Sequence, residues 1–121
     1  MSELRKPHKI TRVTIKWLEK QYADANKAYF YGALPTFVKF AIREKMSSLG
    51  ETSRYTDTNG VLLYHSIEIS RLVTNCGKRM TMIILLHEMN HLLVGVDANH
   101  GKKWQEARVR LMHTGAYDDV L

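Results

Sequence analysis

The spacing of hydrophobic positions predicts a helix near the N-terminus, from Thr11 to Tyr31. Apolar side chains recur in this segment at the three- and four-residue spacing of one helix face, namely Val13, Trp17, Ala25, Ala28 and Tyr29. The helix should end where the chain reads YGALP, because Gly32 and Pro35 do not continue a helix.

Two segments in the middle of the chain have the composition of β-strands. Residues from Phe37 to Ile42 are rich in strand formers, and residues from Val61 to Ser70 alternate between two faces. The Asn59-Gly60 dipeptide just before the second segment is a turn signal, so a short strand over Glu51 to Tyr55 is expected to pair back. These segments predict a small sheet.

The second half of the chain predicts two more helices. The segment from Lys78 to Val94 is apolar on nearly every side, follows Thr74-Asn75, which can cap, and ends at Gly95. Such a helix is expected to be central and buried. A last helix should run from Lys102 to Met112. We therefore predict one α+β domain over residues 1–121, with a small, mostly antiparallel sheet packed on the central helix and with N- and C-terminal helices beside it.

Charge and cysteine content limit the classes of binding partner and of metal site that the chain can have. The 121 residues include 18 Lys and Arg against 12 Asp and Glu, a net charge of +6. The basic residues are spread along the chain, so they are explained either by a solvated surface or by non-specific DNA binding. The lone cysteine, Cys76, excludes an internal disulfide framework and a four-cysteine zinc ribbon.

No membrane or secretory signal is expected. The N-terminal segment MSELRKPHKITRV is basic but has no apolar stretch behind it. The most apolar segment, Met80 to Val96, is too short and too polar in its middle to span a bilayer. We therefore expect a cytoplasmic protein with no membrane partner.

The predicted central helix contains an H-E-x-x-H motif. Because residues four apart lie on one helix face, His87 and His91 can offer imidazole nitrogens to one metal ion. Glu88 lies on the adjoining edge, where its carboxylate can act as general base toward a zinc-activated water. The alternative is a chance match, but burying these side chains in an apolar helix without a metal or partner is costly. The motif therefore predicts a zinc site.

Catalytic zinc takes three protein ligands and a water, so a third ligand is needed. We favour His100, which a short loop after Gly95 can return to the pair. Asp97 is the rival, six residues after His91, although the tight glycine turn that such sites require would fall at Val94. Glu106, on the last predicted helix, is a third choice.

The order of several motifs resembles the SprT-like metalloprotease domain, from about residue 22 to about residue 114. The matching segments are Asn26-x-x-Tyr29-Phe30-x-Gly32-x-Leu34-Pro35, Gly50 between two strands, Ile67-Glu68-Ile69-Ser70, Leu85-Leu86-His87-Glu88-Met89-x-His91, and His100-Gly101-x-x-Trp104. The resemblance implies zinc bound by His87, His91 and His100, with Glu88 as general base. The family includes the Spartan proteases, which digest proteins crosslinked to DNA.

The chain departs from many SprT-like proteins in two respects. The loop between His91 and His100 is short, and nothing after His113 can supply a C-terminal zinc ribbon. We therefore expect a minimal form of the domain. DNA targeting would have to come from its own basic surface or from a partner.

These observations predict a zinc-dependent metalloprotease with a protein substrate. One alternative is a DNA-associated binding module whose zinc site is structural or vestigial. Another is a zinc hydrolase with a non-protein substrate. Glu88 favours an enzyme, because a purely structural site has no use for an uncoordinated carboxylate beside the metal.

Overall fold

The computed structural model describes residues 12–95 and 100–118. Along the chain, the elements are α2 (Ile15–Tyr29), β1 (Val38–Arg43), β2 (Gly50–Thr56), β3 (Leu62–Ser70), α3 (Arg71–Asn75), α4 (Lys78–Val94) and α5 (Lys102–His113). The α+β prediction is confirmed, and the central helix has the predicted bounds. The part of the first predicted helix before residue 12 lies outside the described residues.

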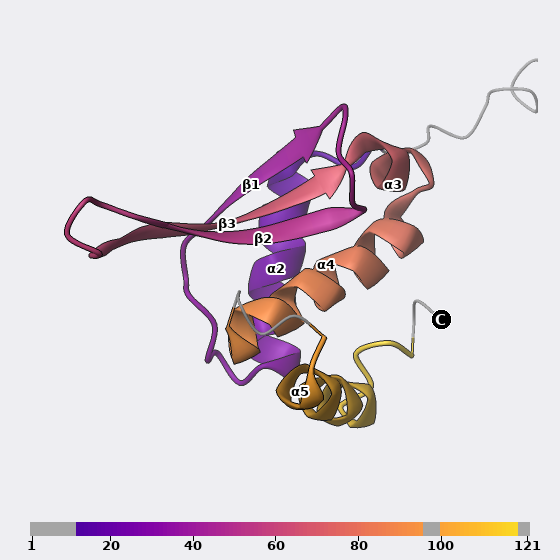
Figure 1. Ribbon diagram of the computed structural model, residues 1–121. Helices are drawn as coiled ribbons and strands as arrows, with labels where there is room; N and C mark the ends of the chain where they lie inside the picture. The colour runs from indigo at the N-terminus through magenta and orange to yellow at the C-terminus, as the bar shows by residue number, and fades with distance from the viewer. Residues whose placement is uncertain (1–11, 96–99, 119–121) are drawn as a thin grey trace, which may run out of the picture.

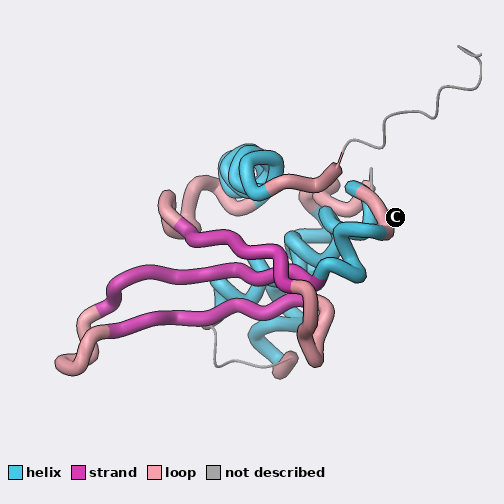
Figure 2. Tube along the Cα trace, turned by 90° about the horizontal axis from the view of Figure 1, so that it is seen from above, coloured by secondary structure: helices cyan, strands magenta, loops and turns pink. Residues whose placement is uncertain are grey.

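The three strands form one mixed sheet in the order β1-β3-β2. Figure 2 shows the strands side by side, with β3 in the middle. β3 is antiparallel to β2 but parallel to β1, so the expectation of a mostly antiparallel sheet was wrong for one of the two pairings. The reason is topological: the β2–β3 hairpin returns the chain into the space between β1 and β2, where β3 runs in the direction of β1.

The predicted turn before β3 is present and well satisfied. The Asp57 carboxylate accepts hydrogen bonds from the backbone N–H groups of Asn59 and Val61, at 2.8 and 2.9 Å. Gly60 has a φ of +83°, which glycine adopts at little cost. The hairpin therefore closes as the Asn-Gly signal predicted, and it extends beyond the helices at the left of Figure 1.

α4 is the central element of the fold. It packs against β2 and β3 on one side and against α2 and α5 on others (Figure 1). The fully buried apolar side chains come from helices and sheet alike, and they are Leu18, Ile67, Ile69, Leu85, Leu86 and Met89. A helix in this position must satisfy its polar side chains with partners from its neighbours.

The start of α4 differs from the prediction. Thr74 and Asn75 belong to the short helix α3, which the sequence did not predict, and they do not cap α4. The residue before α4 is instead Gly77, whose φ of +101° is strained for other residues. The carbonyl of Gly77 accepts a hydrogen bond from the Thr81 hydroxyl at 2.8 Å.

Within residues 12–95 and 100–118, none of the helices has the length and hydropathy that a bilayer span would require.

Asn26 connects the end of α2 to the segment that leads into β1. Its side-chain amide donates to the carbonyl of Leu34, and its side-chain oxygen accepts from the N–H of Leu34, both at 3.1 Å. Asn26 and Leu34 are both buried. The Tyr22 hydroxyl donates to the carbonyl of Pro35 one residue later. These bonds set the path of the chain between α2 and the sheet.

We predict that Asn26→Ala lowers the free energy of unfolding by about 2 kcal/mol or more, because two buried backbone groups of Leu34 lose their partners at about 1–3 kcal/mol each. Urea unfolding followed by circular dichroism measures this. Asn75→Ala, at an exposed position of α3, is the matched control and should change stability by less than about 0.5 kcal/mol. Equal effects of the two variants would contradict the role given to Asn26.

Candidate metal centre

α4 brings two histidines of the motif to one side of the helix. His87 and His91 are one turn apart, and their ring centroids are separated by 5.1 Å. Both rings are half-buried, beside the fully buried Leu86 and Met89 that anchor this turn in the core. The helix therefore holds the two imidazoles in a fixed relation to each other.

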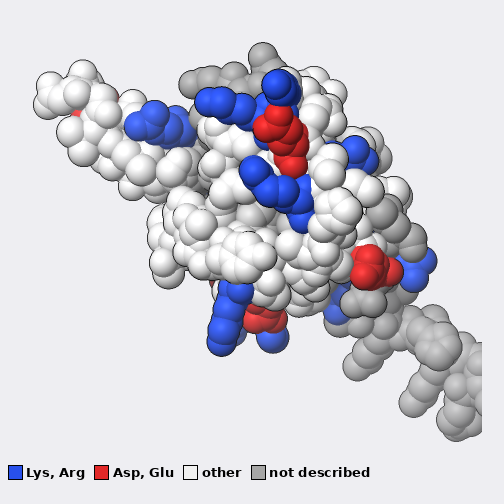
Figure 3. Space-filling view, turned by 90° about the horizontal axis from the view of Figure 1, so that it is seen from below, with Lys and Arg blue, Asp and Glu red and all other residues white. Residues whose placement is uncertain are grey.

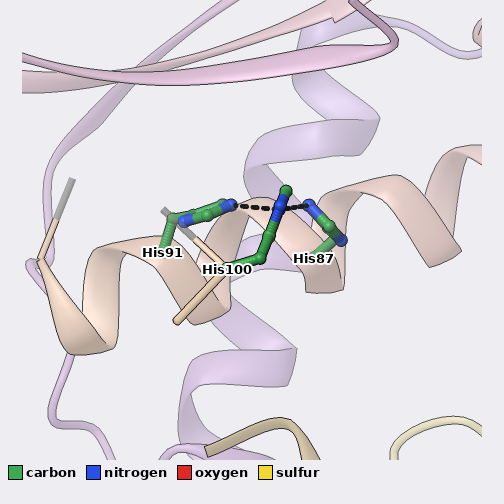
Figure 4. A group of neighbouring side chains, drawn as sticks. All are labelled: His87, His91 and His100. Carbon is green, nitrogen blue, oxygen red and sulfur yellow. Dashed lines mark hydrogen bonds between the residues drawn. The ribbon is translucent and has the colours of Figure 1, made fainter. Parts of the chain in front are cut away.

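His100 reaches this pair from just before α5. Its Nε2 atom lies 3.0 Å from Nε2 of His87 and 3.2 Å from Nε2 of His91. Figure 4 shows the three rings with these nitrogens turned toward one point. Among the described residues, these three histidines form the group that could hold a metal ion.

The separations of the His100 nitrogen from those of His87 and His91 fit a tetrahedral metal ion. Two nitrogens that bind one tetrahedral zinc ion at about 2.0–2.1 Å lie about 3.3–3.4 Å apart, which is close to the observed 3.0 and 3.2 Å. Hydrogen bonds alone do not satisfy the group. A neutral imidazole nitrogen donates one proton or accepts through one lone pair, so His100 can bond to only one of its two neighbours. A cation that receives the lone pairs of the three Nε2 atoms satisfies all three of these atoms.

The protonation of the histidines also suits metal binding. Burial, followed by the nearby His91, His100 and Arg108, lowers the pKa of His87 to about 4. Burial and His100 lower the pKa of His91 as well. Both imidazoles are therefore neutral at pH 7, with a lone pair available for a metal.

Trp104 packs against all three histidines. Its ring centroid lies 4.8 Å from that of His87, 5.6 Å from that of His91 and 4.7 Å from that of His100. The indole is buried. It therefore forms an apolar support that limits the rotation of the three rings.

Asn90 joins α4 to α5 beneath the site. Its side chain is fully buried, and its amide donates to the backbone carbonyl of Trp104 at 3.1 Å. This bond fixes the first turn of α5, which follows His100 by two residues. Sequence reasoning did not assign Asn90 a role. The signal was present, because a polar residue in a nearly apolar helix requires a partner.

Glu88 lies beside the histidines and is only 4% exposed. Its Oε1 atom accepts a hydrogen bond of 2.6 Å from the hydroxyl of Thr52, which comes from β2. Burial raises the pKa of Glu88 and nearby Glu51 adds to the rise, while the Thr52 hydrogen bond opposes it. The sequence did not identify Thr52, because it is 36 residues away in the chain.

A cleft of about 350 Å³ contains these groups. One wall comes from β2 and the residues before it, and the other comes from α4 and His100. The lining residues are Ser48, Leu49, Gly50, Glu51, Thr52, Ile84, His87, Glu88, His91 and His100. The cleft therefore places a buried carboxylate and three imidazoles on one open space.

The three residues considered as the third ligand differ in where the structure places them. His100 is brought to the pair. Glu106 is not, because it lies on the exposed side of α5, where its Oε1 is 3.9 Å from Nζ of Lys102. Asp97 lies outside the described residues. That His100 binds a metal ion stays a prediction.

Fold and site together define a class of protein, an α+β domain in which three histidines that could hold a metal ion are gathered around an H-E-x-x-H helix. The model of the SprT-like family matches residues 18–118, and the chain belongs to this family. The resemblance seen in the sequence is confirmed. A comparison with curated proteins gave no match.

We predict that His100→Ala weakens metal binding, because the two histidines left on α4 form an open site with one ligand too few. Elemental analysis after mild chelator dialysis measures the bound metal. Glu106→Ala is the control and should retain a full equivalent, because Glu106 is outside the three-histidine group. A full equivalent in His100→Ala would show that another residue is the third ligand.

Proposed function

We propose that this chain is a zinc-dependent metalloprotease. The observation that carries the proposal is the position of Glu88, a buried carboxylate in the same cleft as three converging imidazoles. Structural zinc sites use four protein ligands, whereas three leave a position for water or substrate. Membership of the SprT-like family is compatible with this activity.

The residues of the cleft would have different roles in peptide hydrolysis. His87, His91 and His100 would hold the zinc ion. When bound, zinc would lower the pKa of a water molecule and polarise the substrate carbonyl. Glu88 accepts the proton of the attacking water and then passes it to the leaving amine nitrogen. The raised pKa of Glu88 makes its carboxylate a stronger base for the first of these steps.

The substrate would lie along β2. In the order β1-β3-β2, β2 is an edge strand, and its residues Gly50, Glu51 and Thr52 line the cleft. An extended peptide can add to such an edge through backbone hydrogen bonds, which would bring its carbonyl groups past Glu88. This arrangement supports a protein substrate with an extended, locally unfolded segment.

A second candidate function, binding of DNA, is favoured by the charge of α5. This helix has four exposed basic residues and one acidic residue, Glu106; the basic residues are Lys102, Lys103, Arg108 and Arg110. Figure 3 looks onto the side of the molecule where α5 lies in Figure 1, and basic side chains gather there. Because α5 begins two residues after His100, bound DNA would lie beside the cleft.

We predict that Glu88→Gln keeps the metal and the fold but lowers kcat by roughly 10²–10⁴-fold, because the amide retains the shape of the side chain and cannot accept the proton. The measurement is cleavage of an unfolded, basic protein by the zinc-loaded chain, with metal content determined on the same samples. Glu19→Gln, on the exposed side of α2, is the control. Unchanged turnover in Glu88→Gln would contradict this mechanism. An inactive wild type with a full equivalent of zinc would favour a DNA-associated binding module.

For the DNA-binding candidate, we predict a steep loss of affinity with salt and a shallower slope when Lys102 and Lys103 are both changed to Glu. Each lost phosphate contact should reduce the slope of log K against log salt by about one unit. Fluorescence anisotropy with a single-stranded oligonucleotide measures the slope. The pair Lys16→Glu and Lys20→Glu on α2 makes the same change in net charge. Equal effects of both pairs would show that binding is not localised to α5.

A further inference from the structure

We infer that strand β2 positions the general base: Thr52 holds one carboxylate oxygen of Glu88, and Gly50 leaves the space that the other oxygen occupies. The inference rests on the proposed function, because it gives Glu88 a catalytic role. It assigns the side chain of Thr52 and the missing side chain of Gly50 a positioning role that acts through Glu88, separate from the backbone contacts proposed between β2 and the substrate.

The Thr52 hydroxyl is placed to bond to Glu88 alone. Its Oγ1 atom lies 2.6 Å from Oε1 of Glu88 and 3.2 Å from the backbone carbonyl oxygen of the same residue. A hydroxyl donates one proton, and a carboxylate is a stronger acceptor than a carbonyl. The shorter contact is therefore the hydrogen bond, and it restrains the end of a side chain that would otherwise rotate.

The register of the sheet directs Thr52 to the site. Thr52 pairs with Ile67 of β3, which is fully buried on the face that packs against α4. Its neighbour Ser53 pairs with Ser66 and points to the opposite face. A slip of one residue would turn Thr52 away from Glu88, so the β2–β3 hairpin sets this contact.

Gly50 contributes by having no side chain. A Cβ atom at this position would lie 2.9 Å from Cγ2 of Ile84, 3.1 Å from Oε2 of Glu88 and 3.2 Å from Cγ of Glu88. The φ of Gly50 is not positive, so backbone strain does not require glycine here. The requirement is space: any larger residue would push against the carboxylate that Thr52 holds.

The two contacts act on different oxygens of one carboxylate. Thr52 bonds to Oε1, and Gly50 faces Oε2. Among the described residues, Oε2 has no hydrogen-bond partner of its own and remains available for the proton of water. Displacement of a reacting group by about 1 Å can lower the rate about 100-fold, so this alignment bears directly on turnover.

The first test is kinetic. In the zinc-loaded protein, Thr52→Val keeps the branched shape but removes the donor, and it should lower kcat about 10–100-fold with little change in KM or metal content. Thr52→Ser retains the hydroxyl and should restore most of kcat. Thr58→Val makes the same change at an exposed site in the turn between β2 and β3, outside the cleft, and should have no effect. The inference is overturned if Thr52→Val keeps wild-type kcat, or if Thr52→Ser is as slow as Thr52→Val.

The second test separates the two contacts of Gly50. Gly50→Ala should lower kcat, and adding Ile84→Ala should not restore it, because the contact with Glu88 remains. Recovery in the double variant would show that Gly50 acts through Ile84, which would overturn its assignment. Wild-type kcat in Gly50→Ala would overturn it as well.

A third test does not depend on activity or metal. In the metal-free protein, the shift in the urea midpoint caused by Thr52→Val should be smaller when Glu88 is already Ala, because the two side chains interact. Additive shifts would overturn the inference whatever the activity. If the wild type cleaves no protein but the shifts are non-additive, the proposed function fails and the positioning of Glu88 by β2 stands.

Discussion

The burial of polar side chains on α4 is the constraint on which the structure depends. Glu88 and Asn90 are almost completely buried, and His87 and His91 are half-buried, in a helix that is otherwise apolar. Burying a polar group without a partner costs about 1–3 kcal/mol. Each of these side chains therefore requires a neighbour, and the neighbours are supplied by different parts of the fold.

The partners join α4 to the rest of the molecule. β2 provides Thr52 for Glu88, and the backbone of α5 at Trp104 provides an acceptor for Asn90. The histidines meet His100 at the start of α5. The contacts that stabilise the core are thus the same contacts that enclose the cleft, so the sheet and α5 cannot shift without disturbing the site.

Burial has opposite effects on the two kinds of titratable group in the site. It lowers the pKa of His87 and His91, because it disfavours the charged imidazolium. It raises the pKa of Glu88, because it disfavours the carboxylate. One environment therefore produces neutral imidazoles and a more basic carboxylate, which is the combination that metal-assisted hydrolysis requires.

The sequence by itself determined the features that depend on residues close in the chain. The spacing of His87 and His91 places them on one helix face, and Asn59-Gly60 closes the β2–β3 hairpin, because both depend on local backbone geometry. Only the tertiary structure decided the parallel pairing of β1 with β3. It also brings His100, which the sequence already favoured, to the pair and leaves Glu106 outside it. Thr52 lies 36 residues from Glu88, and their contact depends on strand register and on how α4 packs against the sheet. No periodicity in the sequence encodes such distances, because they arise only when separate elements bury their apolar faces together.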